Sequence, residues 1–256
     1  MEGMGLKSRI KSLIFACCSV LSIGGLAAFA TSKQNEKICE KVSIKIDNEY
    51  NNYFIGDSEV RGLLTREGER KLEGLPNQNI DLKNLEKRIE SHKFVRDAEV
   101  YRGLDGNIQV FVKQNRPIAR IIRQDQDVYI DAEGNILPLS DRYTARVIPI
   151  TKSAQLKPTD RGFFRDSLGH SYLSLLQFIE NDEFWKAQLA HMHIDGRGKV
   201  SFLPQVGEHT IEFGKPEKVE EKFKKLAILY KKVLPTMGWD RYKRVNVEFE
   251  DQIICE

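Results

Sequence analysis

The feature that most restricts the fold of this chain is a run of 21 residues without a charged side chain, from residue 12 to residue 32. At about 1.5 Å per residue, a helix of that length crosses a hydrocarbon layer of about 30 Å. Residues 1–11 are too short to form a domain, and a long following domain is translocated largely regardless of its charge. We therefore expect one transmembrane helix over residues 12–32, with a cytoplasmic tail at 1–11.

A cleaved signal peptide is the alternative for this segment. Ala28-Phe29-Ala30 fits the small-x-small pattern of a cleavage site. The apolar run is longer than the usual signal core of about 7–15 residues, which favours a retained anchor. Under either interpretation, the rest of the chain lies across the membrane from the cytoplasm.

The composition indicates folded domains and gives little support for several kinds of ligand. Hydrophobic residues make up 41% of the chain, too many for a disordered protein. The 40 basic and 37 acidic side chains leave a net charge of only +3, so no nucleic-acid partner is expected. The sequence contains no phosphate-binding loop, His-Glu-x-x-His motif or dinucleotide fingerprint. We expect no enzymatic activity, no cofactor and no small-molecule substrate.

The four cysteines exclude the common paired motifs. Cys17 and Cys18 lie in the apolar run, and no Cys-x-x-Cys pair exists for zinc or redox chemistry. A disulfide between Cys39 and Cys255 is formally possible outside the cytoplasm, but spacing alone does not establish it.

Residues 38–115 show the pattern strand, helix, helix, strand, strand. Asp57 or Ser58 is a candidate cap for the first helix, and Asp81 for the second. Asp105-Gly106 separates the last two strands and is typical of a tight hairpin turn. These residues predict one small domain.

Residues 116–256 are richer in strands. Arg116-Pro117 marks the boundary, because proline biases the preceding residue toward extended structure. Short strands separated by turns surround two amphipathic helices, one around residues 168–179 and one beginning near Pro216. Alternating apolar residues predict one continuous final strand over 245–254. The predicted class is α+β: a transmembrane helix, a small β-α-α-β-β domain and a mainly antiparallel C-terminal β domain with two helices.

One group of side chains suggests a metal. His191, His193 and Asp195 alternate along a predicted strand and would share one face, a spacing that suits zinc or copper. The other interpretation is a surface strand that runs into a hairpin, since a closed site needs a further ligand. A membrane-tethered hydrolase or metal-binding protein therefore remains an alternative, although our expectation is that no metal is bound.

The order of these motifs resembles the FtsQ/DivIB family of cell-division proteins, whose small domain is similar to a POTRA domain. The likeness covers most of residues 10–256. Asn115 stands where the family usually has a glutamate. The residues that carry the likeness are Ile80-Asp81-Leu82, Phe94 to Val100, Asn115-Arg116-Pro117-Ile118-Ala119 and Tyr129 to Gly134.

The resemblance implies a scaffold of the bacterial divisome, anchored once in the cytoplasmic membrane at the division septum. Its expected partners are FtsB-like and FtsL-like proteins and other membrane proteins of the divisome. In the family, an FtsB strand adds to the open edge of the last strand, where Phe249 falls at an aromatic anchor position. Glu248 falls where a basic residue is often found. The expected partner-binding residues are Val245, Val247, Glu248, Phe249, Asp251 and Ile253.

Two alternatives stay open. The final strand could be an internal strand with both edges paired, because central strands also alternate. A POTRA-bearing factor for outer-membrane or secretion assembly would share the small domain, although such factors usually carry several modules or a barrel.

Overall fold

The computed structural model describes residues 15, 17–22, 24–25, 37–69, 71–153, 164 and 167–256. Among these residues, no helix is both long and apolar enough to cross a membrane. Of the expected span, residues 15, 17–22 and 24–25 are helical, whereas the rest of 12–32 and the tail 1–11 lie outside the described part. The chain divides into two compact units, Met1–Asn48 with Ile55–Gln114 and Glu49–Phe54 with Asn115–Glu256.

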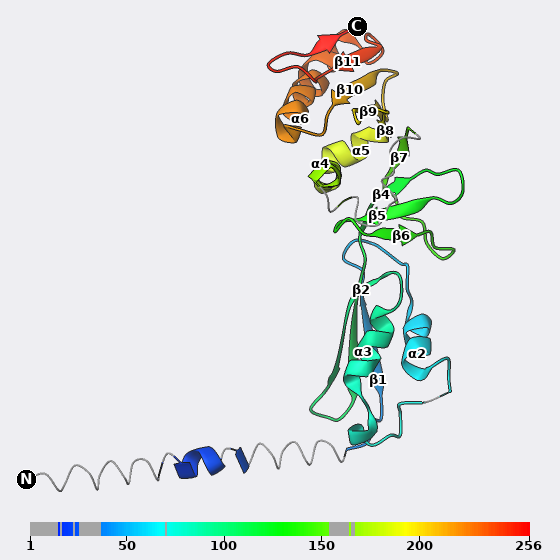
Figure 1. The fold of residues 1–256 in the computed structure, drawn as a ribbon, viewed down its shortest axis with the longest axis vertical. Coiled ribbons are helices and arrows are strands. Elements are labelled where there is room, and N and C mark those ends of the chain that lie inside the picture. Colours follow the sequence, from blue (N-terminus) through cyan, green and yellow to red (C-terminus); the bar gives the residue numbers. More distant parts are fainter. Residues whose placement is uncertain are drawn as a thin grey trace, which may run out of the picture. The chain divides into compact units, whose positions relative to one another are not determined.

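Unit 1 is a three-stranded sheet with two helices, in the expected order strand, helix, helix, strand, strand (Figure 1). The spatial order is β1-β3-β2, with β1 parallel and β2 antiparallel to the central strand. The helices bury Val60, Leu64, Leu85 and Ile89, because these residues recur at helical spacing. The elements are β1 (Val42–Asp47), α2 (Asp57–Thr65), the 3₁₀ turn η1 (Asn77–Asn79), α3 (Leu82–Glu90), β2 (Val95–Arg102) and β3 (Ile108–Gln114).

Of the two helix caps predicted in unit 1, one is confirmed and the other is wrong. Asp81 caps α3, since its carboxylate accepts a hydrogen bond from the Asn84 N–H at 3.1 Å. The expected cap of α2 is wrong: Gly56 occupies the N-cap position, and its N–H donates to Glu59 at 3.2 Å. Asp57 instead lies inside the helix and pairs with Arg61. A carboxylate three residues into the helix thus replaces a side-chain cap.

Unit 2 is built on a nine-stranded mixed sheet with the order β12-β11-β10-β9-β8-β7-β4-β5-β6. Five neighbouring pairs are antiparallel and three are parallel, consistent with the expected mainly antiparallel domain. The strands are β4 (Pro117–Ile121), β5 (Val128–Asp131), β6 (Ile136–Pro138), β7 (Ile148–Lys152), β8 (Leu189–Ile194), β9 (Val200–Pro204), β10 (Thr210–Gly214), β11 (Arg244–Asn246) and β12 (Ile254–Cys255).

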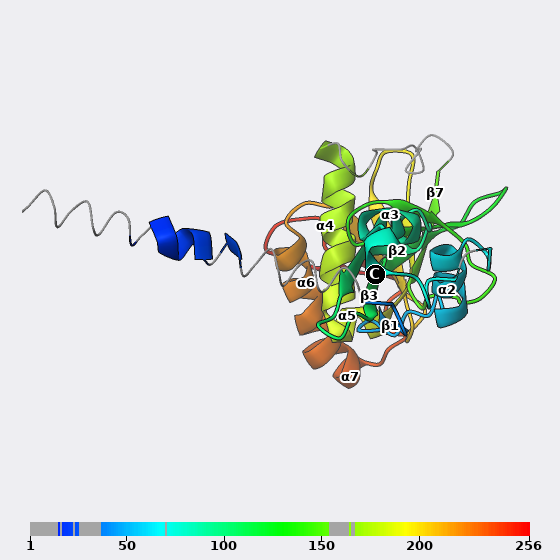
Figure 2. The ribbon, with the colours of Figure 1, turned by 90° about the horizontal axis from the view of Figure 1, so that it is seen from below.

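The helices of unit 2 are α4 (Ser167–Asn181), α5 (Glu183–Gln188) and α6 (Val219–Ile228), and the last continues through the π-helical turn η3 (Leu229–Val233) into α7 (Leu234–Met237). Helices α4 and α6 lie on the same side of the sheet (Figures 1 and 2), where the rings of Phe178 and Phe223 stack at 4.8 Å. Neither α5 nor the π-helical turn is predicted by the spacing of apolar residues. Pro235 accounts for the turn, because it cannot donate to the carbonyl four residues earlier.

The segment Glu49–Phe54 belongs to unit 2 although it lies between β1 and α2 in the sequence. The Tyr143 hydroxyl donates to the Asn51 carbonyl at 2.8 Å, and the ring of Phe54 meets that of Tyr143 edge-on at 4.9 Å. Alternation and capping patterns report the structure of neighbouring residues only, so they gave no sign of this long-range packing.

The two cysteines outside the apolar run are free thiols in the structure. Cys39 is fully buried in unit 1 and Cys255 lies partly buried in β12. Burial raises the pKa of both thiols.

The predicted final strand over 245–254 is wrong. Strand β11 ends at Asn246, and the chain reverses through residues 247–253 before β12. Asp251 has a φ of +54°, the left-handed conformation that a continuous strand does not contain. Apolar alternation is the same in both arrangements, so it could not reveal the reversal.

Unit 2 should lose stability below about pH 6.5, because His209 is fully buried beside Tyr230, with its Nε2 2.8 Å from the hydroxyl. Burial lowers the pKa of His209 and outweighs the raising effects of the Trp239 backbone and Asp240. The folded state favours neutral imidazole, so its contribution is complete above the unfolded-state pKa and is lost as the pH falls toward the folded-state pKa.

Thermal unfolding of wild type and His209→Gln between about pH 8 and pH 5 measures this contribution. We expect the melting temperature of the variant to fall less on acidification than that of wild type. Equal pH dependence would contradict the assignment to His209.

Candidate functional site at the C-terminal edge of the sheet

The last strands of unit 2 are paired on more sides than the sequence predicts. Strand β11 lies between β10, to which it is parallel, and β12, to which it is antiparallel. Beyond β11, the Val247 N–H donates to the Glu212 carbonyl at 3.1 Å. The alternative of an internal strand with both edges paired is therefore what the structure shows for β11. The outermost strand at this end is β12, which is two residues long.

The C-terminus closes the outer side of β11. Arg244 and Glu256 exchange both backbone hydrogen bonds, at 3.0 and 2.9 Å, and the Lys243 N–H also donates to the Glu256 carbonyl. The guanidinium of Arg244 contacts the Glu256 carboxylate at 2.7 Å. Val245 lies opposite Cys255, and Asn246 lies opposite Ile254. The chain thus provides its own edge strand.

Residues 247–253 form a loop that α6 holds from one side. The ammonium of Lys225 donates to the carbonyls of Val247 at 2.9 Å, Gln252 at 3.3 Å and Phe249. Lys218, just before α6, forms an ion pair with Glu250. A single lysine therefore donates to carbonyl groups that, in a continuous strand, would accept hydrogen bonds from a neighbouring strand.

A groove of 460 Å³ lies between this loop and α6. Its apolar lining comes from Ile228, Phe249 and Ile253, and charged side chains of α6 and of the loop surround them. Ile228 is 54% exposed and Phe249 is 48% exposed. Exposed apolar side chains beside a groove with mixed charges are typical of a protein-binding surface.

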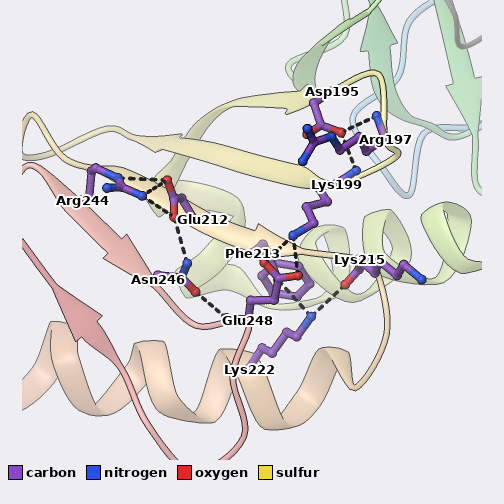
Figure 3. A network of polar contacts seen from close by, with 10 residues as sticks. All are labelled: Asp195, Arg197, Lys199, Glu212, Phe213, Lys215, Lys222, Arg244, Asn246 and Glu248. Atoms are coloured by element: carbon purple, nitrogen blue, oxygen red, sulfur yellow. Dashed lines mark hydrogen bonds and ion pairs between the residues drawn. The ribbon is translucent and has the colours of Figure 1, made fainter.

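A polar network fixes the inner end of the loop (Figure 3). Arg244 forms an ion pair with Glu212 at 2.8 Å, and Glu212 accepts a hydrogen bond from the Asn246 amide. Asn246 in turn accepts from the Glu248 N–H at 2.9 Å, and the Glu248 carboxylate pairs with Lys199 at 2.7 Å. The charge of Glu248 is therefore neutralised within the chain.

Lys222 ties α6 to the end of β10 (Figure 3). Its buried ammonium donates to the carbonyls of Phe213 at 2.9 Å and Lys215 at 2.8 Å and lies 4.7 Å from the centre of the Phe213 ring. Burial lowers the pKa of Lys222, with Glu248 and Glu217 opposing this effect. The neighbouring Lys225 is thus held on a helix whose position is fixed by buried contacts.

The structure divides the six expected partner-binding residues into two groups. Val245 and Val247 are fully buried core residues. Phe249, Asp251 and Ile253 line the groove together with Glu248. Lys218, Lys225 and Ile228 also line the groove, although no motif in the sequence marks them as partner-binding residues. Lys225 and Ile228 are three residues apart in α6 and so share one face, which is the signal that the sequence contains.

The three candidate metal ligands do not come together as one site. The Thr151 hydroxyl lies 3.1 Å from His191 Nε2 and 2.9 Å from His193 Nδ1. Asp195 instead accepts the N–H groups of Arg197 and Lys199 and closes its own turn. Within the described part of the chain, no three His, Cys, Asp or Glu residues are placed to hold a metal ion.

The fold defines a two-domain protein in which a POTRA-like module precedes a strand-rich domain. The model of the POTRA-like domain matches residues 37–113. The model described as FtsQ/DivIB, C-terminal related, matches residues 116–256, more than half of the chain. The chain therefore belongs to the FtsQ/DivIB family, a family of non-enzymatic cell-division scaffolds. No curated protein matches the chain.

Lys225→Met should loosen the C-terminal loop without unfolding unit 2. The variant removes the donor shared by three loop carbonyls, so hydrogen exchange at Ile254–Glu256 should accelerate about tenfold. Exchange in β8 and β9 should not change, because the Lys225 ammonium bonds to the loop and not to these strands.

Lys232→Met is the matched control, since Lys232 is an exposed lysine further along the same helical segment and lies outside the groove. Equal exchange at Ile254–Glu256 in both variants would show that Lys225 does not hold the loop.

Proposed function

We propose that this protein is a non-enzymatic scaffold of the bacterial divisome that binds FtsB-like and FtsL-like proteins through the C-terminal edge of unit 2. The scaffold sits in the cytoplasmic membrane at the septum through the span at residues 12–32, with both units outside the cytoplasm. Anchoring in the plane of the membrane concentrates it with partners that are themselves membrane proteins.

The observation that carries this proposal is the match of residues 116–256 to the C-terminal related domain of FtsQ/DivIB, together with the sheet edge at the end of that domain. An edge strand presents N–H and C=O groups that an added strand can satisfy, and alternate side chains give specificity. The groove beside β12 adds the exposed ring of Phe249 next to this edge. A match to this domain also favours a divisome scaffold over an assembly factor for outer-membrane or secretion machinery.

The arrangement supports strand addition at this edge with Phe249 as the apolar anchor. A ring that is half exposed beside a groove gains most when a partner covers it, because burial of the remaining apolar surface contributes about 25 cal/mol per Å². Asp251 lines the same groove, and its carboxylate favours a partner with a basic residue beside its apolar contact.

Phe249→Asp should abolish copurification of the FtsB-like protein from cells that produce the tagged full chain. A charge in the groove opposes burial against an apolar partner side chain and should weaken binding at least tenfold. The thermal melt should change little, because about half of the side chain is already exposed.

Leu203→Asp is the control. Leu203 is 47% exposed, almost the same as Phe249, but it lies in β9 away from the groove. Retained copurification in Phe249→Asp, with an intact fold, would show that the partner does not use this edge.

A further inference from the structure

Strand β12 covers the side of β11 on which another strand would pair. The Arg244 N–H and C=O are both bonded to Glu256, and the Asn246 position faces Ile254. The other side of β11 is closed by β10. A partner strand can therefore pair with β11 only if the C-terminal residues leave.

The outer edge of β12 is a poor docking strand by itself. It contains two residues, and successive residues of a strand point their N–H and C=O groups to opposite sides. Very short edge strands are a means by which proteins prevent strand addition. An added strand on β12 would thus gain few hydrogen bonds and no fixed register.

The contacts that hold β12 and the preceding loop are weak enough for a competing strand to replace them. The ion pairs Lys218–Glu250 and Arg244–Glu256 are formed by side chains that are more than half exposed, and such pairs contribute little stability. Asp251 adopts a left-handed φ of +54°, which costs a non-glycine residue about 1 kcal/mol. A competing strand would replace each backbone hydrogen bond that the tail gives up.

The sequence of the loop is compatible with a second, extended conformation. Val245, Val247 and Phe249 alternate with polar residues, as in a strand with one buried face. In the structure, this alternation stops at the reversal over residues 247–253, where the loop carbonyls bond to Lys225 instead of a strand. Release of the tail would allow β11 to lengthen and offer more backbone groups.

We infer that residues Gln252–Glu256 are an internal stand-in for the partner strand, and that an extended segment of the partner displaces them from β11. This inference rests on the proposed function and adds how the edge is opened. Because these residues already pair with the backbone of β11, their side chains indicate which side chains the partner segment should carry.

The expected partner segment runs antiparallel to β11. It carries a carboxylate opposite Arg244, where Glu256 lies now, and a small apolar residue opposite Val245, where Cys255 lies now. A larger aliphatic residue lies opposite Asn246, in place of Ile254. An extended segment with the order aliphatic, small apolar, acidic is therefore the kind of occupant that fits.

A single substitution can lock the tail in place. Arg244 and Glu256 form a hydrogen-bonded pair, so Val245 and Cys255 form the adjacent non-hydrogen-bonded pair, in which Cα atoms are about 4.5 Å apart. This spacing falls within the range of disulfides, about 4.4–6.8 Å. Val245→Cys should therefore form a disulfide with Cys255 on oxidation.

The test measures binding of the purified extracytoplasmic part of the FtsB-like protein from the same bacterium to the full chain in nanodiscs. Oxidised Val245→Cys should bind at least tenfold more weakly than the same protein after reduction. Wild type, oxidised and reduced in the same way, controls for Cys17, Cys18 and Cys39.

The complementary variants release the tail. A chain that ends at Asp251 should bind about tenfold more tightly than wild type, because no binding free energy is spent on displacing β12. Ile253 and Cys255 pack against the core, so this deletion also lowers stability. Lys225→Met keeps those residues and should tighten binding in the same direction.

The outcomes separate the inference from the function on which it rests. Equal binding by oxidised and reduced Val245→Cys, with the disulfide confirmed by mass spectrometry, would overturn tail displacement and leave the proposed scaffold function intact. Dimerisation of the shortened chain without tighter partner binding would also overturn it and assign the edge to a second copy. Failure of wild type and reduced Val245→Cys to bind at all would overturn both proposals.

Discussion

Every strand at the end of a sheet has one row of backbone groups without a neighbour, and the arrangement of unit 2 depends on how that row is closed at β11. The chain closes it with its own last residues, which return through residues 247–253 and pair as β12. Buried anchoring of α6 by Lys222 fixes the helix from which Lys225 reaches the loop. The outer edge, the groove and the exposed Phe249 all follow from this closure.

The two faces of β11 have different roles. On one side, Val245 and Val247 are part of the core, so they set the position of β11. On the other side, Arg244, Glu212, Asn246, Glu248 and Lys199 form a continuous polar network that keeps the strand in register. A scaffold needs such a rigid frame, because an added strand is specified only where the strand beside it is fixed.

Much of the fold was predictable from the sequence. The order of elements in unit 1 follows from apolar spacing, the Asp81 cap and the Asp105-Gly106 turn, all of which act between neighbouring residues. The conformation of the last ten residues was not predictable in the same way. Alternation from Val245 onward fits one long strand, and the reversal depends on Lys225, about twenty residues earlier.

The candidate site illustrates the same limit. Phe249 was expected from the resemblance, and the structure places it half exposed in a groove. The contacts of Lys225 could not be predicted, because its carbonyl partners lie in a segment that apolar alternation predicts as strand. Long-range contacts of this kind determine which of two locally compatible conformations a segment adopts.

Hydrogen exchange of the full chain, with and without the proposed FtsB-like partner, shows whether a partner strand replaces the C-terminal residues on β11. If the partner replaces the tail, the amide of Arg244 stays protected in the complex while that of Glu256 loses its protection. If both amides stay as protected as in the free protein while the partner is bound, the C-terminal tail is not displaced and the partner binds without opening this edge.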